Sequence, residues 1–102
     1  MVEIAELIKN SIRKQDYVGR WGGEEFLLVY PETMIDGGKT VTEKVRSAIE
    51  NSIFNFSGID LKITVTFGVA VHTTGKSIDS VIKEADDALY RGKQQGRNCV
   101  IT

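Results

Sequence analysis

The sequence predicts an α+β domain, and three observations support that prediction. Apolar residues recur with helical spacing in three segments, which are residues 2–14, 35–51 and 78–95. Residues 17–30 contain two short apolar runs on either side of a Gly-Gly pair, which is typical of a β-hairpin. Residues 61–71 alternate between apolar and small or polar side chains, as a strand with one buried face does.

Length and composition limit the possible functions. A chain of 102 residues forms one domain at most, with a modest core. Thirteen basic and fourteen acidic residues give a net charge of -1, so no nucleic-acid polymer or anionic membrane is expected as a partner. The single cysteine, Cys99, excludes an internal disulfide and fits a reducing compartment, so we expect a cytoplasmic protein. Cys99 and the one histidine, His72, are too few for the usual zinc site.

The first helix, residues 2–14, is expected to be amphipathic, and the polar residues Arg13–Asp16 follow its last apolar position. No N-cap precedes it, because Met1 runs directly into the periodic pattern. We therefore expect that the chain enters partway along a longer helix. Its apolar stripe is Ile4, Ala5, Ile8 and Ile12, with Leu7 beside it.

The predicted hairpin turn carries Gly22, Gly23, Glu24 and Glu25. Successive strand residues point to opposite faces, so the two carboxylates share a direction only if a bulge intervenes. Backbone without Cβ atoms beside a carboxylate suits a phosphate-bearing ligand held with a hard cation. A charged, solvated hairpin tip is the alternative that spacing alone leaves open.

The second helix is expected to begin at Thr33–Asp36, which resembles a capping box. Its charged face is interpreted as a solvated surface and not as a site. Phe54–Phe56 is expected to be a short extended piece, Ser57–Asp60 a turn, and His72 a solvated loop residue. The charged face consists of Lys39, Glu43, Lys44, Arg46 and Glu50.

The last helix starts near Ser77 or Ile78 and is followed by Gly96 in the C′ position. Lys93 and Arg97 lie four residues apart at this C-terminus. They either complement the helix dipole or form a pair of cations for phosphates. A closing strand, Cys99–Ile101, follows, and the expected apolar face of the helix is Ile78, Val81, Ile82, Ala85, Leu89 and Gly92.

Three motifs resemble the GGDEF-domain diguanylate cyclase family. Gly22–Phe26 reads Gly-Gly-Glu-Glu-Phe, an accepted form of the family signature. Residues 64–70 resemble the family's threonine-rich strand, which ends in Gly-Val-Ala. Residues 85–98 resemble the segment Ala-Asp-x-Ala-Leu-Tyr-x-Ala-Lys-x-x-Gly-Arg-Asn, with Gly92 where Ala is usual. The motifs occur in the family's order, so the resemblance spans essentially the whole chain.

This resemblance implies a ferredoxin-like mixed sheet with helices and a reaction that joins two GTP molecules into cyclic di-GMP, releasing pyrophosphate. Each domain of a face-to-face homodimer holds one GTP, with Mg²⁺ or Mn²⁺. The carried-over roles are as follows: Glu24 and Glu25 in catalysis and metal binding, Gly22 and Gly23 in the close approach of the nucleotide, and Lys93 and Arg97 in phosphate binding. Arg13 and Asp16 match the family's Arg-x-x-Asp pair, five residues before the Gly-Gly turn, which forms a product-inhibition site for cyclic di-GMP.

The resemblance also implies parts that residues 1–102 do not contain. The family begins with a central strand carrying a metal-binding Asp, followed by a Phe-Lys-x-x-Asn-Asp stretch that helps to recognise guanine. We therefore expect a partial, truncated GGDEF domain, inactive alone. Its bare strand edges favour a strand-swapped or edge-paired dimer, or a rearranged sheet that brings the hairpin strand and the strand over residues 61–71 together. The alternative is a non-catalytic module that binds cyclic di-GMP through Arg13 and Asp16, or an interaction domain.

Overall fold

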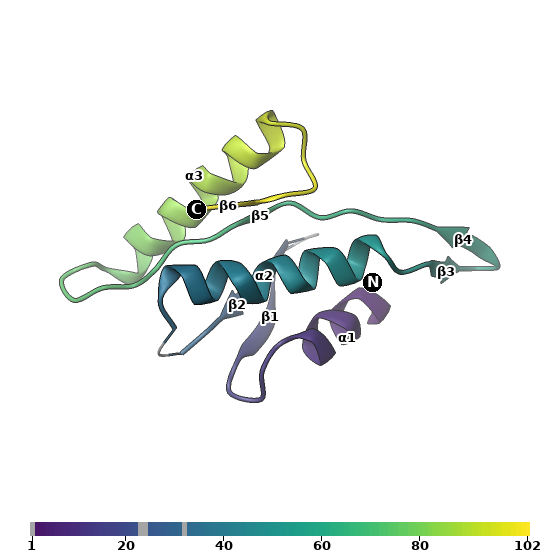
Figure 1. Ribbon diagram of the computed structural model, residues 1–102, viewed down its shortest axis with the longest axis horizontal. Helices are drawn as coiled ribbons and strands as arrows, with labels where there is room; N and C mark the ends of the chain where they lie inside the picture. Colours follow the sequence, from purple (N-terminus) through teal and green to yellow (C-terminus); the bar gives the residue numbers. More distant parts are fainter. Residues whose placement is uncertain (1, 23–24, 32) are drawn as a thin grey trace.

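A computed structural model confirms the predicted α+β class. The structure describes residues 2–22, 25–31 and 33–102. Side chains are described for these residues except residues 2–3, 17–22 and 25–27. Two long helices and a shorter one are combined with short strands (Figure 1). In chain order, the elements are α1 (Val2–Ser11), β1 (Tyr17–Gly22), β2 (Glu25–Val29), α2 (Ile35–Glu50), β3 (Phe54–Phe56), β4 (Ile59–Leu61), β5 (Phe67–Gly68), α3 (Ile78–Gln94) and β6 (Val100–Ile101). In the described part of the chain, no helix is long and apolar enough to span a membrane.

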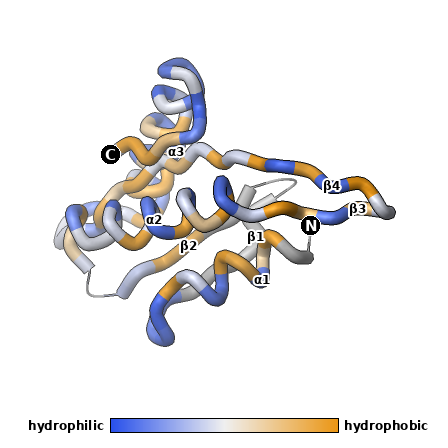
Figure 2. Tube along the Cα trace, turned by 45° about the vertical axis from the view of Figure 1, so that its right-hand side comes forward, coloured by the Kyte–Doolittle hydropathy of each residue, from blue (hydrophilic) through white to orange (hydrophobic). Residues whose placement is uncertain are grey.

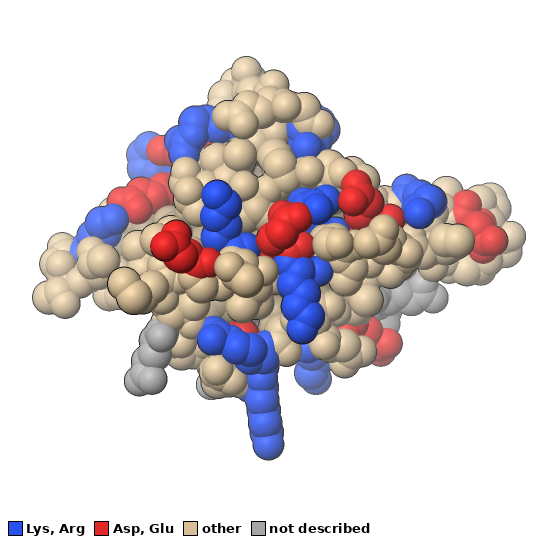
Figure 3. Space-filling view, in the orientation of Figure 1, with Lys and Arg blue, Asp and Glu red and all other residues tan. Residues whose placement is uncertain are grey.

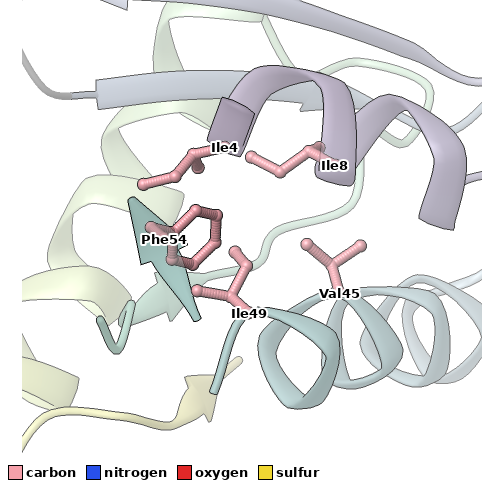
Figure 4. Close-up of a cluster of buried hydrophobic side chains, with 5 residues drawn as sticks. All are labelled: Ile4, Ile8, Val45, Ile49 and Phe54. Atoms are coloured by element: carbon pink, nitrogen blue, oxygen red, sulfur yellow. The ribbon is translucent and has the colours of Figure 1, made fainter. Parts of the chain in front are cut away.

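The core lies where α1 packs against α2. Ile4 and Ile8 are four residues apart on α1, so they share the face that meets α2. Figure 4 shows both pointing toward Val45 and Ile49 of α2 and toward Phe54 of β3. All five side chains are buried, and Figure 2 shows that apolar residues alternate with polar ones along both helices. Ile4 and Ile8 belong to the apolar stripe predicted for the first helix, so that part of the core was predicted correctly.

Helix α1 ends at Ser11, earlier than the predicted end at residue 14. The backbone N–H of Asp16 donates to the carbonyl of Arg13 at 2.9 Å, which closes a turn immediately after the helix. The side chain of Asp16 also accepts from the backbone N–H of Arg13 at 2.9 Å. Residues 13–16 therefore form a side-chain-stabilised turn, which competes with continuation of the helix.

The strands form three separate pairs: β1 with β2 and β3 with β4, both antiparallel, and β5 with β6, parallel. The strand expected over residues 61–71 is correct only in part, because the ladder covers Ile59–Leu61 and Phe67–Gly68. Alternation can indicate a strand, but a ladder also needs a neighbour, and no described strand pairs with residues 62–66. The turn expected at Ser57–Asp60 is shorter than predicted, because only Ser57 (φ 51°) and Gly58 (φ 84°) turn the chain.

The capping box expected at Thr33–Asp36 is wrong. The N-cap of α2 is Met34, whose side chain makes no capping hydrogen bond. The hydroxyl of Thr33 instead donates to the carbonyl of Pro31 at 2.9 Å. The cap of α3 matches the expectation, since the hydroxyl of Ser77 accepts from the backbone N–H of Ser80 at 3.1 Å. Ile78 does not join the buried face of α3 and is 62% exposed.

Helix α3 packs directly on the backbone of β5. A Cβ atom on Gly68 would lie 2.0 Å from the carbonyl oxygen of Ala85 and 2.4 Å from the nitrogen of Leu89. A Cβ atom on Gly92 would lie 2.7 Å from Cγ2 of Thr66. Glycine at position 92, where the resembling family usually has alanine, therefore allows the last turns of α3 to approach residue 66 closely. This contact sets the position of the helix end that carries Lys93.

Candidate functional site

The predicted hairpin is present, but part of its turn lies outside the described residues. Strands β1 and β2 pair from Tyr17 opposite Val29 to Gly22 opposite Glu25. The register shifts between Arg20 and Gly22, so an irregularity of the bulge type precedes the turn. Gly23 and Glu24 are outside the described residues, and the side chain of Glu25 is not described. The roles predicted for these three residues and Gly22 stay predictions.

Arg13 and Asp16, which the resemblance to the family predicted to belong together, form a bidentate ion pair. Nε of Arg13 donates to Oδ2 of Asp16 at 3.0 Å, and Nη2 donates to Oδ1 at 2.9 Å. Nη2 also donates to the hydroxyl of Thr33 at 2.5 Å, which ties the turn after α1 to the N-terminal end of α2. The side chain of Asp16 is 0% exposed, whereas that of Arg13 is 41% exposed. Asp16 therefore fixes the guanidinium, and Arg13 presents it to solvent.

The charges of this pair stabilise each other. Hydrogen bonding to Arg13 holds the pKa of the Asp16 carboxyl below its usual value, against the opposing effect of burial. The same bond raises the pKa of Arg13, so the pair is ionised at neutral pH. Tyr30 is close enough to feel the charges of Arg13 and Asp16, and burial raises the pKa of its hydroxyl. That hydroxyl is satisfied by the hydroxyl of Thr42 at 2.8 Å.

Lys93 and Arg97 lie at and just beyond the C-terminal end of α3, as the sequence predicted. Both are exposed, and no ion pair or side-chain hydrogen bond involves either one within the described residues. Lys93 borders a shallow hollow of about 210 Å³, together with Asp86, Leu89 and Tyr90. A larger open hollow of about 290 Å³ lies near Val71 and Thr102 and includes none of the predicted site residues. The two cations are positioned either to complement the helix dipole or to bind an anion.

The charged face of α2 does more than solvate the helix, which corrects the interpretation from sequence. Figure 3 shows basic and acidic side chains interleaved over α2, without a large patch of one sign on that face. Arg46 bonds Glu43 on its own helix at 2.9 and 3.0 Å and reaches Glu50 at 3.3 Å. Nη1 of Arg46 also donates to Oδ1 of Asn98 at 2.8 Å, across 52 positions of sequence.

Asn98 is the centre of a cluster that sequence reasoning missed. Its side-chain amide donates to Glu50, and its backbone N–H donates to the hydroxyl of Thr66 at 2.9 Å. Hydrogen bonds from Asn98 and Arg46 lower the pKa of the Glu50 carboxyl. The i, i+3 and i, i+4 spacing of Glu43, Arg46 and Glu50 is a visible signal for pairing within the helix. Nothing in the spacing indicates the link to Asn98.

The group of Arg13, Asp16 and Thr33 and the group around Asn98 make contacts at opposite ends of α2. Thr33, the partner of Arg13, precedes the first residue of the helix, and Glu50, the partner of Asn98, is its last residue. A helix of 16 residues spans roughly 24 Å. Among the described residues, no three His, Cys, Asp or Glu side chains form a metal-binding group.

The comparisons with known proteins identify the family. The family described as "Diguanylate cyclase, GGDEF domain" matches residues 1–99. The chain belongs to the GGDEF domain family. Diguanylate cyclase DgcM from Escherichia coli strain K12 is 42% identical to it over 98 residues, which are 96% of this chain and 23% of DgcM.

Solved structures of this family have the same fold. The diguanylate cyclase SiaD from Pseudomonas aeruginosa, crystallised with its activator SiaC, matches with a TM-score of 0.92 and 35% identity, over 98% of this chain and 38% of SiaD. The GGDEF domain of DgcB from Caulobacter crescentus, crystallised with c-di-GMP, matches with a TM-score of 0.87 and 32% identity, over 96% of this chain and 59% of that chain. The GGDEF domain sequence therefore spans less than two thirds of each of these relatives.

Proposed function

We propose that this GGDEF chain is part of a diguanylate cyclase, whose whole protein condenses two GTP molecules into cyclic di-GMP and pyrophosphate. The observation that carries the proposal is the C-terminal end of α3, where Lys93 and Arg97 are both exposed. Two exposed cations four residues apart, one in the last turn of α3 and one in the loop that follows it, suit the phosphates of a nucleotide. DgcM and SiaD, which are named diguanylate cyclases, match 96% and 98% of the chain.

The proposal assigns each signature residue a part in holding the substrate. Gly22 and Gly23 lack side chains, so the backbone can approach a nucleotide closely. Glu24 and Glu25 supply carboxylate oxygens, the ligand type that Mg²⁺ and Mn²⁺ prefer, and Mg²⁺ is commonly held by one or two carboxylates with substrate phosphates. A bound divalent cation would supply charge neutralisation at the phosphates and activation of the attacking hydroxyl. Lys93 and Arg97 orient the triphosphate.

The proposal includes a second copy of the chain and a cytoplasmic location. A reaction between two GTP molecules, one held by each domain, requires two domains to meet face to face.

We also propose that residues 1–102 alone produce no cyclic di-GMP, since they contain no Phe-Lys-x-x-Asn-Asp stretch to recognise guanine. Loose placement of the ribose would forfeit positioning, which can account for roughly 7–11 kcal/mol of a barrier.

Calorimetry of GTP binding in the presence of Mg²⁺ tests the proposed phosphate contacts. Lys93→Ala and Arg97→Ala are expected to weaken GTP binding roughly tenfold or more each, because each removes a charge-assisted contact. Arg91→Ala is the matched control, because Arg91 lies on the same helix and donates to the carbonyl of Thr102 at 3.1 Å. Equal losses in all three variants would reduce the effect to net charge and reject specific phosphate contacts.

The alternative is a non-catalytic module that binds cyclic di-GMP, and the geometry of Arg13 favours testing it. Nε and Nη2 of Arg13 are engaged by Asp16 and Thr33, and Nη1 makes no hydrogen bond with the described residues. The exposed side of the guanidinium is thus oriented to bind a phosphate oxygen or to stack on a guanine. DgcB, a related GGDEF domain, binds c-di-GMP in its crystal structure.

Titration of the chain with cyclic di-GMP tests this product site. Arg13→Ala is expected to weaken binding roughly ten- to a hundredfold, the loss of one charge-assisted contact. Lys14→Ala removes a neighbouring exposed cation and is expected to retain the affinity of the original chain. Equal affinity for the original and Arg13→Ala chains, or no binding by either, would reject the site. Product binding without GTP binding would favour the non-catalytic alternative.

A further inference from the structure

The loop that follows α3 has an unusual backbone. Gly96, Arg97 and Asn98 have φ values of 115°, 64° and 50°, so three consecutive residues lie on the left-handed side. Glycine adopts this conformation readily and asparagine does so occasionally, but Arg incurs a steric cost there. Such a backbone persists only when its surroundings hold it. The structure must therefore contain contacts that fix residues 96–98.

Two helices and the segment that precedes β5 supply those contacts. The backbone N–H of Arg97 donates to the carbonyl of Gly92 on α3 at 3.0 Å. The backbone N–H of Asn98 donates to Thr66, which precedes β5, at 2.9 Å. The side chain of Asn98 then bonds two residues of α2, accepting from Arg46 at 2.8 Å and donating to Glu50.

The amide of Asn98 is fixed in one orientation by this arrangement. Its oxygen faces a donor that cannot accept, Arg46, and its nitrogen faces an acceptor, Glu50. Arg46 is itself held by Glu43, and its side chain is only 15% exposed. Because Arg97 is the residue immediately before Asn98, this cluster determines the direction in which the Cα–Cβ bond of Arg97 leaves the backbone. Lys93, which lies within α3, does not depend on the cluster in the same way.

We propose that Asn98, Arg46 and Glu50 are positioning residues that aim Arg97 at the phosphates of the substrate. We call these three residues the α2 clamp. The inference rests on the proposed phosphate role of Arg97 and adds to it the means by which the side chain is held. The clamp contacts no substrate and acts through the backbone of residues 96–98.

An exchange of amide and carboxylate tests the clamp with little change of shape. Asn98→Asp keeps the acceptor for Arg46 but places a carboxylate against the carboxylate of Glu50. We therefore expect the backbone of residues 96–98 to leave its present conformation. Adding Glu50→Gln restores a donor opposite an acceptor, and the net charge of the double variant equals that of the original chain. The control is Arg91→Ala, which removes a cation of α3 outside the clamp.

The measurement is an NMR titration of the ¹⁵N-labelled 102-residue chain with inorganic triphosphate, at a temperature where each variant is folded. Asn98→Asp is expected to change the scalar couplings between the amide and Hα protons at positions 97 and 98, which report on φ. It is also expected to weaken triphosphate binding about tenfold, which corresponds to 1.4 kcal/mol. The Asn98→Asp, Glu50→Gln double variant is expected to recover both the couplings and the affinity to within about threefold, or less than 1 kcal/mol. Arg91→Ala is expected to leave the couplings unchanged.

Two results separate a failure of the clamp from a failure of the proposed function. If Asn98→Asp retains the affinity of the original chain while Arg97→Ala loses it, the phosphate role stands and the clamp is wrong. If Asn98→Asp alters the loop but neither it nor Arg97→Ala changes triphosphate binding, Arg97 does not bind phosphate and both inferences fail. Absence of triphosphate binding by the original chain has the same meaning.

Discussion

Asp16 keeps a negative charge in a position that solvent does not reach. Its carboxylate accepts two hydrogen bonds from the Arg13 guanidinium and one from the Arg13 backbone, and these bonds lower its pKa. Since the folded pKa is below the unfolded value of about 3.9, the stabilisation is complete above that value. It is lost as the pH falls through the lower, folded pKa. Acid should therefore weaken the link between α1 and α2.

Thermal unfolding between pH 7 and pH 2 measures this contribution. Asp16→Asn is expected to lower the midpoint at pH 7, because the buried pair loses its charge-assisted bonds. The difference between the Asp16→Asn variant and the original chain should shrink as the pH falls below about 3.9, because the unfolded original chain then binds a proton at Asp16, and it should be lost below the lower, folded pKa. Glu43 and Glu50 also have lowered pKa values, so only the difference between the two chains isolates Asp16. A constant difference at all pH values would contradict the assignment.

Individual residues differ in how far the sequence reveals their role. Arg13 and Asp16 are three positions apart, and the family's pattern predicted that they belong together. The partner that ties them to α2, Thr33, was assigned to a capping box, because its spacing to Asp36 fits that motif. Asn98 was quoted only as part of a motif, since its partners depend on how α2 lies across the loop. Local spacing predicts local pairs, and contacts between elements require the packed structure.

At the scale of elements, the close contact between α3 and β5 is possible because Gly68 has no side chain. Gly68→Ala would place Cβ against backbone atoms of Ala85 and Leu89, which cannot move without shifting the helix. We expect a loss of roughly 1–3 kcal/mol or more in the free energy of unfolding, as for overpacked interiors. Denaturant titration measures it.

Gly92→Ala is the matched comparison for Gly68→Ala. Its Cβ would meet the side-chain atoms Cγ2 of Thr66 at 2.7 Å and Cγ1 of Ile101 at 3.1 Å, and side chains can adjust. Alanine also gains up to about 1 kcal/mol in helix propensity over glycine. We therefore expect a much smaller loss for Gly92→Ala. A smaller loss for Gly68→Ala than for Gly92→Ala would show that α3 does not lie on β5 as described.

The elements also show where pattern reasoning stops. Helix α3 was predicted nearly to its ends, because its cap Ser77 and the following Gly96 leave local signals, whereas α1 ends three residues earlier than predicted and the predicted cap of α2 was wrong. The alternation over residues 61–71 predicted one strand, but within it only Leu61 and Phe67–Gly68 pair with neighbouring strands. Alternation reports which face is apolar, and whether a ladder forms depends on a partner elsewhere in space.

At the scale of the whole molecule, strand edges remain available for pairing. Within the described residues, β2 pairs only with β1, and residues 62–66 pair with no strand. Unpaired N–H and C=O groups on strand edges favour association with another chain. We therefore expect the 102-residue chain to form an edge-paired or strand-swapped dimer at high concentration.

Light scattering across a concentration series tests this assembly. Thr64→Lys places a charge on an exposed position of the unpaired segment and is expected to shift the chain toward the monomer, since edge lysines oppose pairing. Lys62, two positions earlier, is already exposed, so Lys62→Thr is the opposite change and should favour association. A monodisperse monomer at every concentration for the original chain would rule out edge pairing.

On the scale of the whole molecule, residues of the two proposed sites make contacts at opposite ends of α2: Arg13 bonds Thr33 before the helix, and Asn98, next to Arg97, bonds Glu50, its last residue. One NMR titration tests whether the two sites are separate. The labelled chain is first saturated with GTP and Mg²⁺, and cyclic di-GMP is then added. We expect GTP to move the signals of Lys93, Arg97 and Asn98, and cyclic di-GMP to move those of Arg13, Asp16 and Thr33 without displacing GTP. Displacement of GTP by cyclic di-GMP, or movement of the same signals by both ligands, would contradict the presence of two separate sites.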